Sequence, residues 1–198
     1  MDFSEKYYKD SRMKSGFLGR KAHEFFKETD YRLYLGGVAC SFMDEIGSGA
    51  DFLVIDTMHI LPGELLDIIT LLPFLKDGCM VVLHDIAYGL YSDYPDGFAT
   101  GLAMSSVTAD KYINRDGQRK YRYPNIGAFA VSGETRENAG NLFCSLMVPW
   151  SYVPDNSQLE SYWKTVRKYY PENLQELFRE AVQINRDAVK RHQEYSRL

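Results

Sequence analysis

The sequence predicts an α/β fold built on a parallel sheet, and three observations support this. Strand-like and helix-like segments alternate over residues 16–83. Two unbroken apolar runs, residues 51–56 (DFLVID) and 79–83 (CMVVL), are typical of strands buried on both faces. The span from Ile55 to Leu83 has about the 30 residues of a right-handed strand–helix–strand crossover. This alternation favours a sheet with helices on both faces.

The composition indicates one globular domain with a small appendage. The chain has 198 residues, of which 45% are hydrophobic and 25% charged, and this balance argues against a disordered or fibrous protein. With a net charge of −4, the chain is not expected to have the basic surface of a general nucleic-acid binder. No apolar run approaches the roughly 18 residues of a membrane helix, and the charged start has no signal-peptide core. We therefore expect a cytoplasmic protein with neither nucleic acid nor membrane as a partner.

The three cysteines, Cys40, Cys79 and Cys144, are far apart along the chain. They show neither a metal-binding spacing nor a disulfide framework, so we expect buried thiols.

The first elements follow from periodicity. Apolar residues predict a helix over residues 16–28, and the alternation of residues 31–35 (YRLYL) predicts a strand. Residues 38–46 carry apolar side chains at helical spacing, and Gly47 is placed to end that helix.

A further helix is predicted between the two apolar runs. Pro62 and Glu64 mark its start, and Gly78 is expected to stop it. Its inner face is expected to be Leu65, Ile69 and Leu72.

The second half has a different pattern. Residues 87–104 are rich in turn formers and aromatics and predict a long loop, and two strand-like segments flank the hairpin signal Asp116-Gly117. Helical patterns follow at residues 134–147, about 157–169 and 171–194. We expect an α/β domain over residues 1–133 and a C-terminal helical extension over residues 134–198. The extension could join two copies in a homo-oligomer.

Each of the two apolar runs ends in an acid, Asp56 and Asp85. Ligands of open parallel sheets bind beyond the carboxyl ends of the strands, and neighbouring strands lie about 4.8 Å apart. The two carboxylates could therefore reach one divalent cation or one set of ligand hydroxyls. The alternative is that each aspartate only forms a turn or caps a helix.

Two histidines accompany these acids. His59 lies three residues after Asp56, and His84 directly precedes Asp85. Histidine can act as a general base near neutral pH, although a single loop histidine is more often structural. His23 and His192 lie in charged helical stretches and are expected at the surface.

Two further groups of residues could contact a ligand. Basic residues around the hairpin could bind an anion, or could form a solvated strand face. Aromatic residues after Asp85 could stack on a sugar, or could pack in the core. The basic residues are Lys111, Arg115, Arg119, Lys120 and Arg122, and the aromatic ones are Tyr88, Tyr91, Tyr94 and Phe98.

Residues 51–86 (DFLVIDTMHILPGELLDIITLLPFLKDGCMVVLHDI) resemble the fourth strand, following helix and fifth strand of class I S-adenosylmethionine-dependent methyltransferases. The closest pattern is that of small bacterial members with IDxxH followed by HD. The resemblance extends weakly over residues 1 to about 132, and the start, MDFSEKYYKDSRMKSGF, looks like the family's second strand. It implies a Rossmann-like fold and O-methyl transfer to a small hydroxylated acceptor, with a saccharide as one candidate.

The resemblance also implies roles for individual residues. Asp56 and Asp85 match acids that hold magnesium in metal-dependent O-methyltransferases, and His59 matches the base that takes the acceptor's proton. Asp2 matches the position that holds the ribose of S-adenosylmethionine. Gly36 and Gly37 stand where many members bind the adenine amine, and their backbone is the remaining expected cofactor contact.

One family feature is missing from the sequence. The glycine-rich turn that cradles the cofactor would precede Asp2, so we expect weak cofactor binding or none. Two interpretations stay open: a C-terminal fragment of a methyltransferase, and a non-catalytic methyltransferase-like module that binds a ligand or partner.

Overall fold

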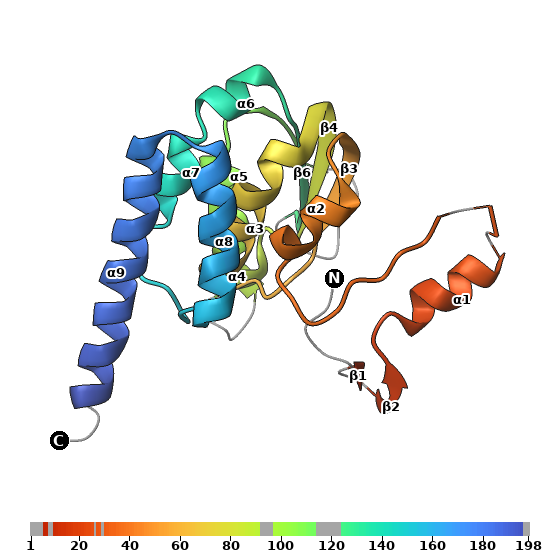
Figure 1. Cartoon of the computed structure of the whole chain (residues 1–198), viewed down its shortest axis with the longest axis horizontal. Helices are drawn as coiled ribbons and strands as arrows, with labels where there is room; N and C mark the ends of the chain where they lie inside the picture. Colours follow the sequence, from red (N-terminus) through yellow and green to blue (C-terminus); the bar gives the residue numbers. More distant parts are fainter. Residues whose placement is uncertain are drawn as a thin grey trace.

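The computed structural model describes residues 6–7, 10–25, 27–28, 30–91, 97–113 and 124–195 (Figure 1). Its strands are β1 (Lys6–Tyr7), β2 (Asp10–Lys14), β3 (Ala50–Ile55), β4 (Leu75–His84), β5 (Asp110–Ile113) and β6 (Ile126–Ala130). The helices are α1 (Phe17–Phe25), α2 (Met43–Ile46), α3 (Gly63–Leu71), α4 (Tyr88–Tyr91), α5 (Ala99–Ser106), α6 (Gly133–Glu137), α7 (Gly140–Ser145), α8 (Asn156–Tyr169) and α9 (Glu172–Tyr195). Two 3₁₀ segments, Ala39–Phe42 and Leu72–Phe74, adjoin α2 and α3.

The central sheet has the strand order β3-β4-β6-β5. β3 and β4 are parallel, and β6 is antiparallel to both β4 and β5. The predicted α/β architecture, with a parallel crossover and an antiparallel hairpin, is therefore confirmed in this general form. The predicted hairpin turn at Asp116-Gly117 lies outside the described residues.

Helix α3 connects the two parallel strands. It begins after Pro62, which stands at the N-cap position and has no backbone N–H that would need a partner there. The predicted inner-face residues Leu65 and Ile69 have no exposed surface. The expected stop at Gly78 was wrong, because α3 ends at Leu71 and β4 is already under way at Gly78. Gly78 instead adopts a φ of +80°, which glycine tolerates, near an irregularity in the β3–β4 register.

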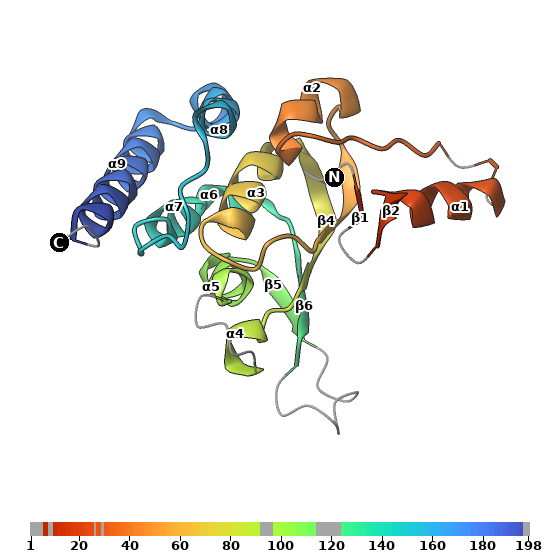
Figure 2. The same ribbon diagram turned by 90° about the horizontal axis from the view of Figure 1, so that it is seen from below.

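Helices cover one face of the sheet and leave the other face open among the described residues. Figure 2 shows α3, α5 and α7 on the same side of β4 and β6. Their apolar side chains form one core with Val81, Leu83 and Phe129, which are almost completely buried. The predictions of strands buried on both faces and of helices on both faces were therefore wrong for this part of the chain.

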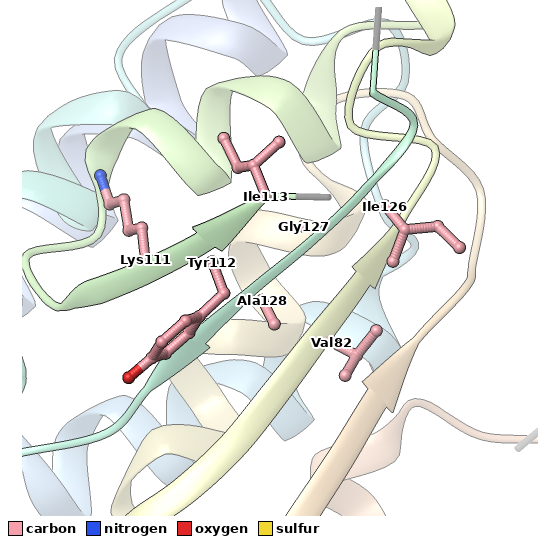
Figure 3. Close-up of a pocket in the computed structure, with 7 residues that line it drawn as sticks. All are labelled: Val82, Lys111, Tyr112, Ile113, Ile126, Gly127 and Ala128. Carbon is pink, nitrogen blue, oxygen red and sulfur yellow. The ribbon is translucent and has the colours of Figure 1, made fainter. Parts of the chain in front are cut away.

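The open face of the sheet is apolar. Phe52 and Val54 of β3 keep 60% and 55% of their surface exposed. A shallow hollow of about 780 Å³ lies on the neighbouring strands (Figure 3). It is lined by Val82, Lys111, Tyr112, Ile113, Ile126, Gly127 and Ala128. The apolar runs in the sequence are thus explained by a sheet with one covered and one uncovered apolar face.

Two other local predictions were wrong. Residues 31–35 form no strand, although Leu35 makes an isolated bridge. The segment 87–104 contains α4 and most of α5 rather than a continuous loop. Gly101 lets α5 approach the chain before it, since a Cβ there would lie 2.6 Å from the carbonyl oxygen of Ile86. The turn-forming glycine therefore serves close packing.

The N-terminal segment does not add a strand to the central sheet. Among the residues that the structure describes, its strands β1 and β2 pair with each other alone, antiparallel, and α1 follows them within the predicted range 16–28 (Figure 2). The expectation that the start supplies a strand of the main sheet was therefore wrong for residues 6–7 and 10–14.

The predicted C-terminal helices are present. Residues 134–147 form the two short helices α6 and α7, and α8 and α9 match the later patterns closely. Asp155 caps α8, because its side chain accepts hydrogen bonds from the backbone N–H groups of Ser157 and Gln158. Among the described residues, no helix combines the length and apolar character that crossing a membrane requires.

Candidate functional site

The candidate site lies where β3 and β4 end side by side. Ile55 pairs with Leu83 in parallel register, so the next residues of both strands emerge at one edge of the sheet. These residues are Asp56 after β3, and His84 and Asp85 at the end of β4. The structure thus brings the two strand-end acids singled out in the sequence, Asp56 and Asp85, to the same edge of the sheet.

Four side chains meet at this edge. Nε2 of His59 lies 3.3 Å from Oδ1 of Asp56 and 3.2 Å from Oδ2 of Asp85. Nδ1 of His84 lies 3.3 Å from each of the same two oxygens. The ligand atoms of Asp56, His59 and His84 all lie within 4.8 Å of one another. We call Asp56, His59, His84 and Asp85 the strand-end cluster.

Two members of the strand-end cluster have unusual backbone conformations. His59 and Asp85 both have a φ of +60°, in the left-handed region that side chains other than glycine rarely adopt. Such a conformation costs about 1–3 kcal/mol and persists only where the surroundings impose it. The His59 loop is held by Leu61, which is fully buried and whose carbonyl oxygen accepts the backbone N–H of Ser151.

A buried carboxylate supports His59 from the opposite side. Glu64, in the first turn of α3, has no exposed surface. Its Oε1 accepts hydrogen bonds from the backbone N–H of His59 at 2.6 Å and from the Thr57 hydroxyl at 2.8 Å. The same oxygen lies 3.5 Å from Nδ1 of His59. Glu64 Oε2 has no hydrogen-bond partner among the described residues.

This arrangement determines which nitrogen of His59 faces the cluster. A carboxylate beside Nδ1 favours the proton on that nitrogen, so we assign the lone pair of the neutral ring to Nε2. The interaction with Glu64 raises the pKa of His59 above its ordinary value, and the charges of Asp85 and Asp56 act in the same direction against burial.

The other side of Asp85 is also held. Its Oδ1 accepts a hydrogen bond from the side-chain amide of Asn125, which precedes β6. This leaves Oδ2 directed at the two histidines. The ring of Tyr88 lies 5.4 Å from that of His59, tilted by 49°. The predicted aromatic contribution from the segment after Asp85 therefore includes a contact with the cluster.

A second acid lies close to Glu64. Asp67 is one turn further along α3, and its Oδ2 lies 3.4 Å from the Thr57 hydroxyl that Glu64 also binds. Burial, and secondly the charge of Glu64, raise the pKa of Asp67 to about 7. Behind the cluster there are thus two acids, the fully buried Glu64 and the partly exposed Asp67.

The donor set only partly fits the magnesium ion that the family resemblance implies. Magnesium prefers oxygen ligands in octahedral geometry and keeps several waters. Asp56 and Asp85 supply such oxygens, but an imidazole nitrogen lies within 3.3 Å of each of them. Two imidazole nitrogens beside these oxygens are donors that transition-metal ions prefer and magnesium does not.

The cofactor residues expected from the resemblance gain little support. Asp2 lies outside the described residues. Gly36 has a φ of +77° and open space where a Cβ would stand, so its backbone is accessible, whereas Gly37 faces the ring of Phe42. The nearby residues Asp30, Arg32, Leu33, Tyr34 and Ile46 line a hollow of about 510 Å³.

The other predicted ligand contacts lie largely outside the described side chains. Of the basic residues around the hairpin, Lys111 is described, and its Nζ donates to the carbonyl oxygen of Ser105. Phe98 is 44% exposed. The side chains outside the described set are those of Tyr91, Tyr94, Arg115, Arg119, Lys120, Arg122 and His192.

Sequence reasoning missed two residues of the site. Glu64 was interpreted only as a helix-start signal, although an acid followed by Leu65-Leu66 in an apolar helix could have indicated a buried carboxylate. Asn125 carried no local signal, because its contact with Asp85 depends on the pairing of β4 with β6.

In comparisons with known proteins, no family model, no curated protein and no solved structure matches this chain.

Proposed function

We propose that the chain is a methyltransferase-type enzyme that transfers the methyl group of S-adenosylmethionine to a hydroxyl of a small acceptor. A saccharide is one candidate acceptor that the sequence resemblance implies. The proposal is supported by the crossover from β3 through α3 to β4, which carries the IDxxH and HD motifs at its two strand ends.

The observation that carries the proposal is the convergence of the strand-end cluster. At the ends of β3 and β4, each of the two imidazoles has a nitrogen within 3.3 Å of an oxygen of each of the two carboxylates. Two of these four residues, His59 and Asp85, have left-handed backbone conformations. Sheets of this class bind their ligands at this edge, and structural turns do not require such a convergence.

The residues of the strand-end cluster have different roles in methyl transfer. A divalent ion between Asp56 and Asp85 would lower the pKa of an acceptor hydroxyl when bound. His59 accepts the hydroxyl proton on Nε2, because Glu64 beside Nδ1 favours the neutral tautomer with its lone pair on Nε2. The acceptor oxygen then forms a bond to the methyl carbon while the carbon–sulfur bond breaks, and S-adenosylhomocysteine leaves with the electron pair.

The test uses the chain with methyl-labelled S-adenosylmethionine at millimolar concentration, because few cofactor contacts are expected. Simple sugars and phenols serve as acceptors, with zinc or magnesium added. We expect metal-dependent transfer of label that Asp85→Asn abolishes while the protein stays folded. The matched control is Asp110→Asn, at an exposed position of β5. Transfer unchanged in Asp85→Asn would refute the proposed role of the cluster, and no transfer under any condition would refute the function.

The open sheet face favours a second candidate, a methyltransferase-like module without catalysis that binds a ligand or partner. Phe52, Val54 and the hollow over β4, β5 and β6 present an apolar surface of the kind that marks interaction sites (Figure 3). Under this alternative, Val54→Glu would abolish binding of a partner or acceptor. Under the enzyme proposal, Asp85→Asn is the variant that abolishes function.

A further inference from the structure

The distances within the strand-end cluster do not describe a hydrogen-bonded network. Charge-assisted N–H···O bonds are usually about 2.7–2.9 Å long. The four contacts here are uniformly 3.2–3.3 Å. Nδ1 of His84 has two carboxylate oxygens in reach but forms a hydrogen bond with neither. It therefore points between the oxygens, as a ligand directed at a shared centre does.

We infer that the strand-end cluster is a four-donor site for zinc or a chemically similar transition-metal ion, and not for magnesium. The ligands are Oδ1 of Asp56, Nε2 of His59, Nδ1 of His84 and Oδ2 of Asp85.

Four of the six distances between the donors can be compared with those of tetrahedral coordination. Zinc binds imidazole nitrogen and carboxylate oxygen at about 2.0–2.2 Å, which places neighbouring ligands of a tetrahedron about 3.3–3.5 Å apart. Magnesium at about 2.0–2.1 Å in an octahedron requires neighbouring ligands at about 2.9 Å. The four distances that join each histidine nitrogen to each carboxylate oxygen, 3.2–3.3 Å, are close to the tetrahedral value. The donors that all lie within 4.8 Å of one another are those of Asp56, His59 and His84, and Asp85 joins them through its contacts with the two histidines.

The chemistry of the donors leads to the same class of ion. Imidazole suits zinc, copper, iron and nickel, whereas carboxylates and waters suit magnesium. Two neutral histidines and two aspartates carry a charge of about −2, which a divalent ion cancels. The disagreement with the family expectation comes from His59 and His84, the two nitrogen donors.

Outer contacts of the cluster resemble those of a built metal site. Metal-bound histidines usually direct their other ring nitrogen at a carboxylate or carbonyl. Glu64, with no exposed surface, stands behind Nδ1 of His59. Asn125 binds the oxygen of Asp85 that does not face the cluster. Two of the four ligands are therefore oriented by partners from α3 and from the segment before β6.

This inference deepens the proposed function and rests on it only for the second role of His59. While His59 is bound to the metal ion, the lone pair of its Nε2 would not be available to accept a proton. Displacement of His59 by an acceptor would free the same lone pair for the proton, so the ligand and base roles follow one another.

The experiment measures metal binding directly. Chain stripped with a chelator is checked by circular dichroism and then titrated with zinc or magnesium in a calorimeter. We expect one zinc ion per chain, bound on the order of a thousandfold more tightly than magnesium. Cobalt should give the intense visible absorption of a four-coordinate ion. All proteins carry Cys144→Ser, because Cys144, which was wrongly expected to be buried, is an exposed thiol that could bind zinc.

Variants show whether the cluster holds the ion. His59→Ala and His84→Ala should each weaken zinc at least about tenfold and abolish the four-coordinate cobalt spectrum. His23→Ala, a histidine on α1 that stacks on Tyr31, is the control that should change neither. If an alanine variant is unfolded, His84→Gln replaces it and should give the same loss.

Three results would overturn the inference: magnesium binding as tight as zinc, a weak six-coordinate cobalt spectrum, or zinc affinity unchanged in the histidine variants. Zinc binding without methyl transfer would refute the proposed function alone. Methyl transfer supported by magnesium with no zinc site would refute this inference alone.

Discussion

Nδ1 of His59 lies 3.5 Å from Oε1 of Glu64, a carboxyl group with no exposed surface. An ionised carboxylate is costly to bury, so its position needs compensating partners. Two hydrogen-bond donors, from the His59 backbone and the Thr57 hydroxyl, supply part of this compensation. The contact links the first turn of α3 to the strand-end cluster and is the basis of the first prediction.

Glu64→Gln should weaken zinc binding by about 10–100-fold, because the amide no longer favours a proton on Nδ1 of His59. Calorimetric titration of the chelator-treated protein measures the change. The matched control is Glu134→Gln, an exposed position in the first turn of α6. Equal zinc affinities of wild type and Glu64→Gln would mean that Glu64 only closes the turn.

His59→Ala should reduce methyl transfer by at least about a hundredfold in any preparation that shows activity, since general-base loss typically costs 10²–10⁴-fold. Affinity for S-adenosylmethionine should stay unchanged, because His59 is not an expected cofactor contact. Turnover and cofactor binding are measured on the same protein. Near-normal turnover in His59→Gln, with only a lower melting temperature in His59→Ala, would instead make His59 a structural residue of the loop.

Asp67 predicts a pH dependence of stability. Its pKa is raised from 3.8 to about 7, so between these values the folded chain keeps a proton that the unfolded chain has lost. The free energy of unfolding should therefore fall as pH rises from about 4 to 7 and level off above it. Since Asp67 is partly exposed, we expect a loss of roughly 1–2 kcal/mol from this group between pH 5 and 8.

Asp67→Asn should remove this part of the slope, and urea unfolding at several pH values tests it. Asp110→Asn, at an exposed position of β5, should keep the wild-type slope. A slope that is the same in all three proteins would show that Asp67 is ionised in the folded chain at pH 6.

Adjacent residues of β3 should respond very differently to truncation. Ile55 is 3% exposed in the core, whereas Val54 is 55% exposed on the open face. Ile55→Ala should cost about 2–5 kcal/mol and Val54→Ala less than about 0.5 kcal/mol in urea unfolding. Similar large losses at both positions would show that the open face is covered in solution.

Much of the fold could be predicted from local patterns. The crossover from β3 to β4 follows from two apolar runs separated by one helix length, and the strand-end position of Asp56 and Asp85 follows from the crossover. The burial of the strands could not be predicted, because an apolar run has the same sequence whether one or both faces are covered. Phe52 and Val54 show this directly.

The composition of the site was harder to predict than its place. The family resemblance gave roles to Asp56, His59 and Asp85, whereas it gave none to His84, which stayed open between a site residue and a structural one. Its role depends on which way the last side chain of β4 points, and the register with β6 determines this. Gly101 is one of the turn formers that led to the wrong prediction of a loop over residues 87–104. A glycine that permits close packing of a helix has the same local sequence signature as a glycine in a turn.

The most direct test of the account is X-ray absorption spectroscopy at the zinc edge on the chain loaded with one zinc ion. A zinc centre at the strand-end cluster should give four ligands at about 2.0–2.1 Å, two of them with the scattering pattern of imidazole, and should lose one imidazole in His84→Ala. A shell of six oxygens without imidazole, or an unchanged spectrum in His84→Ala, would contradict a metal centre at Asp56, His59, His84 and Asp85.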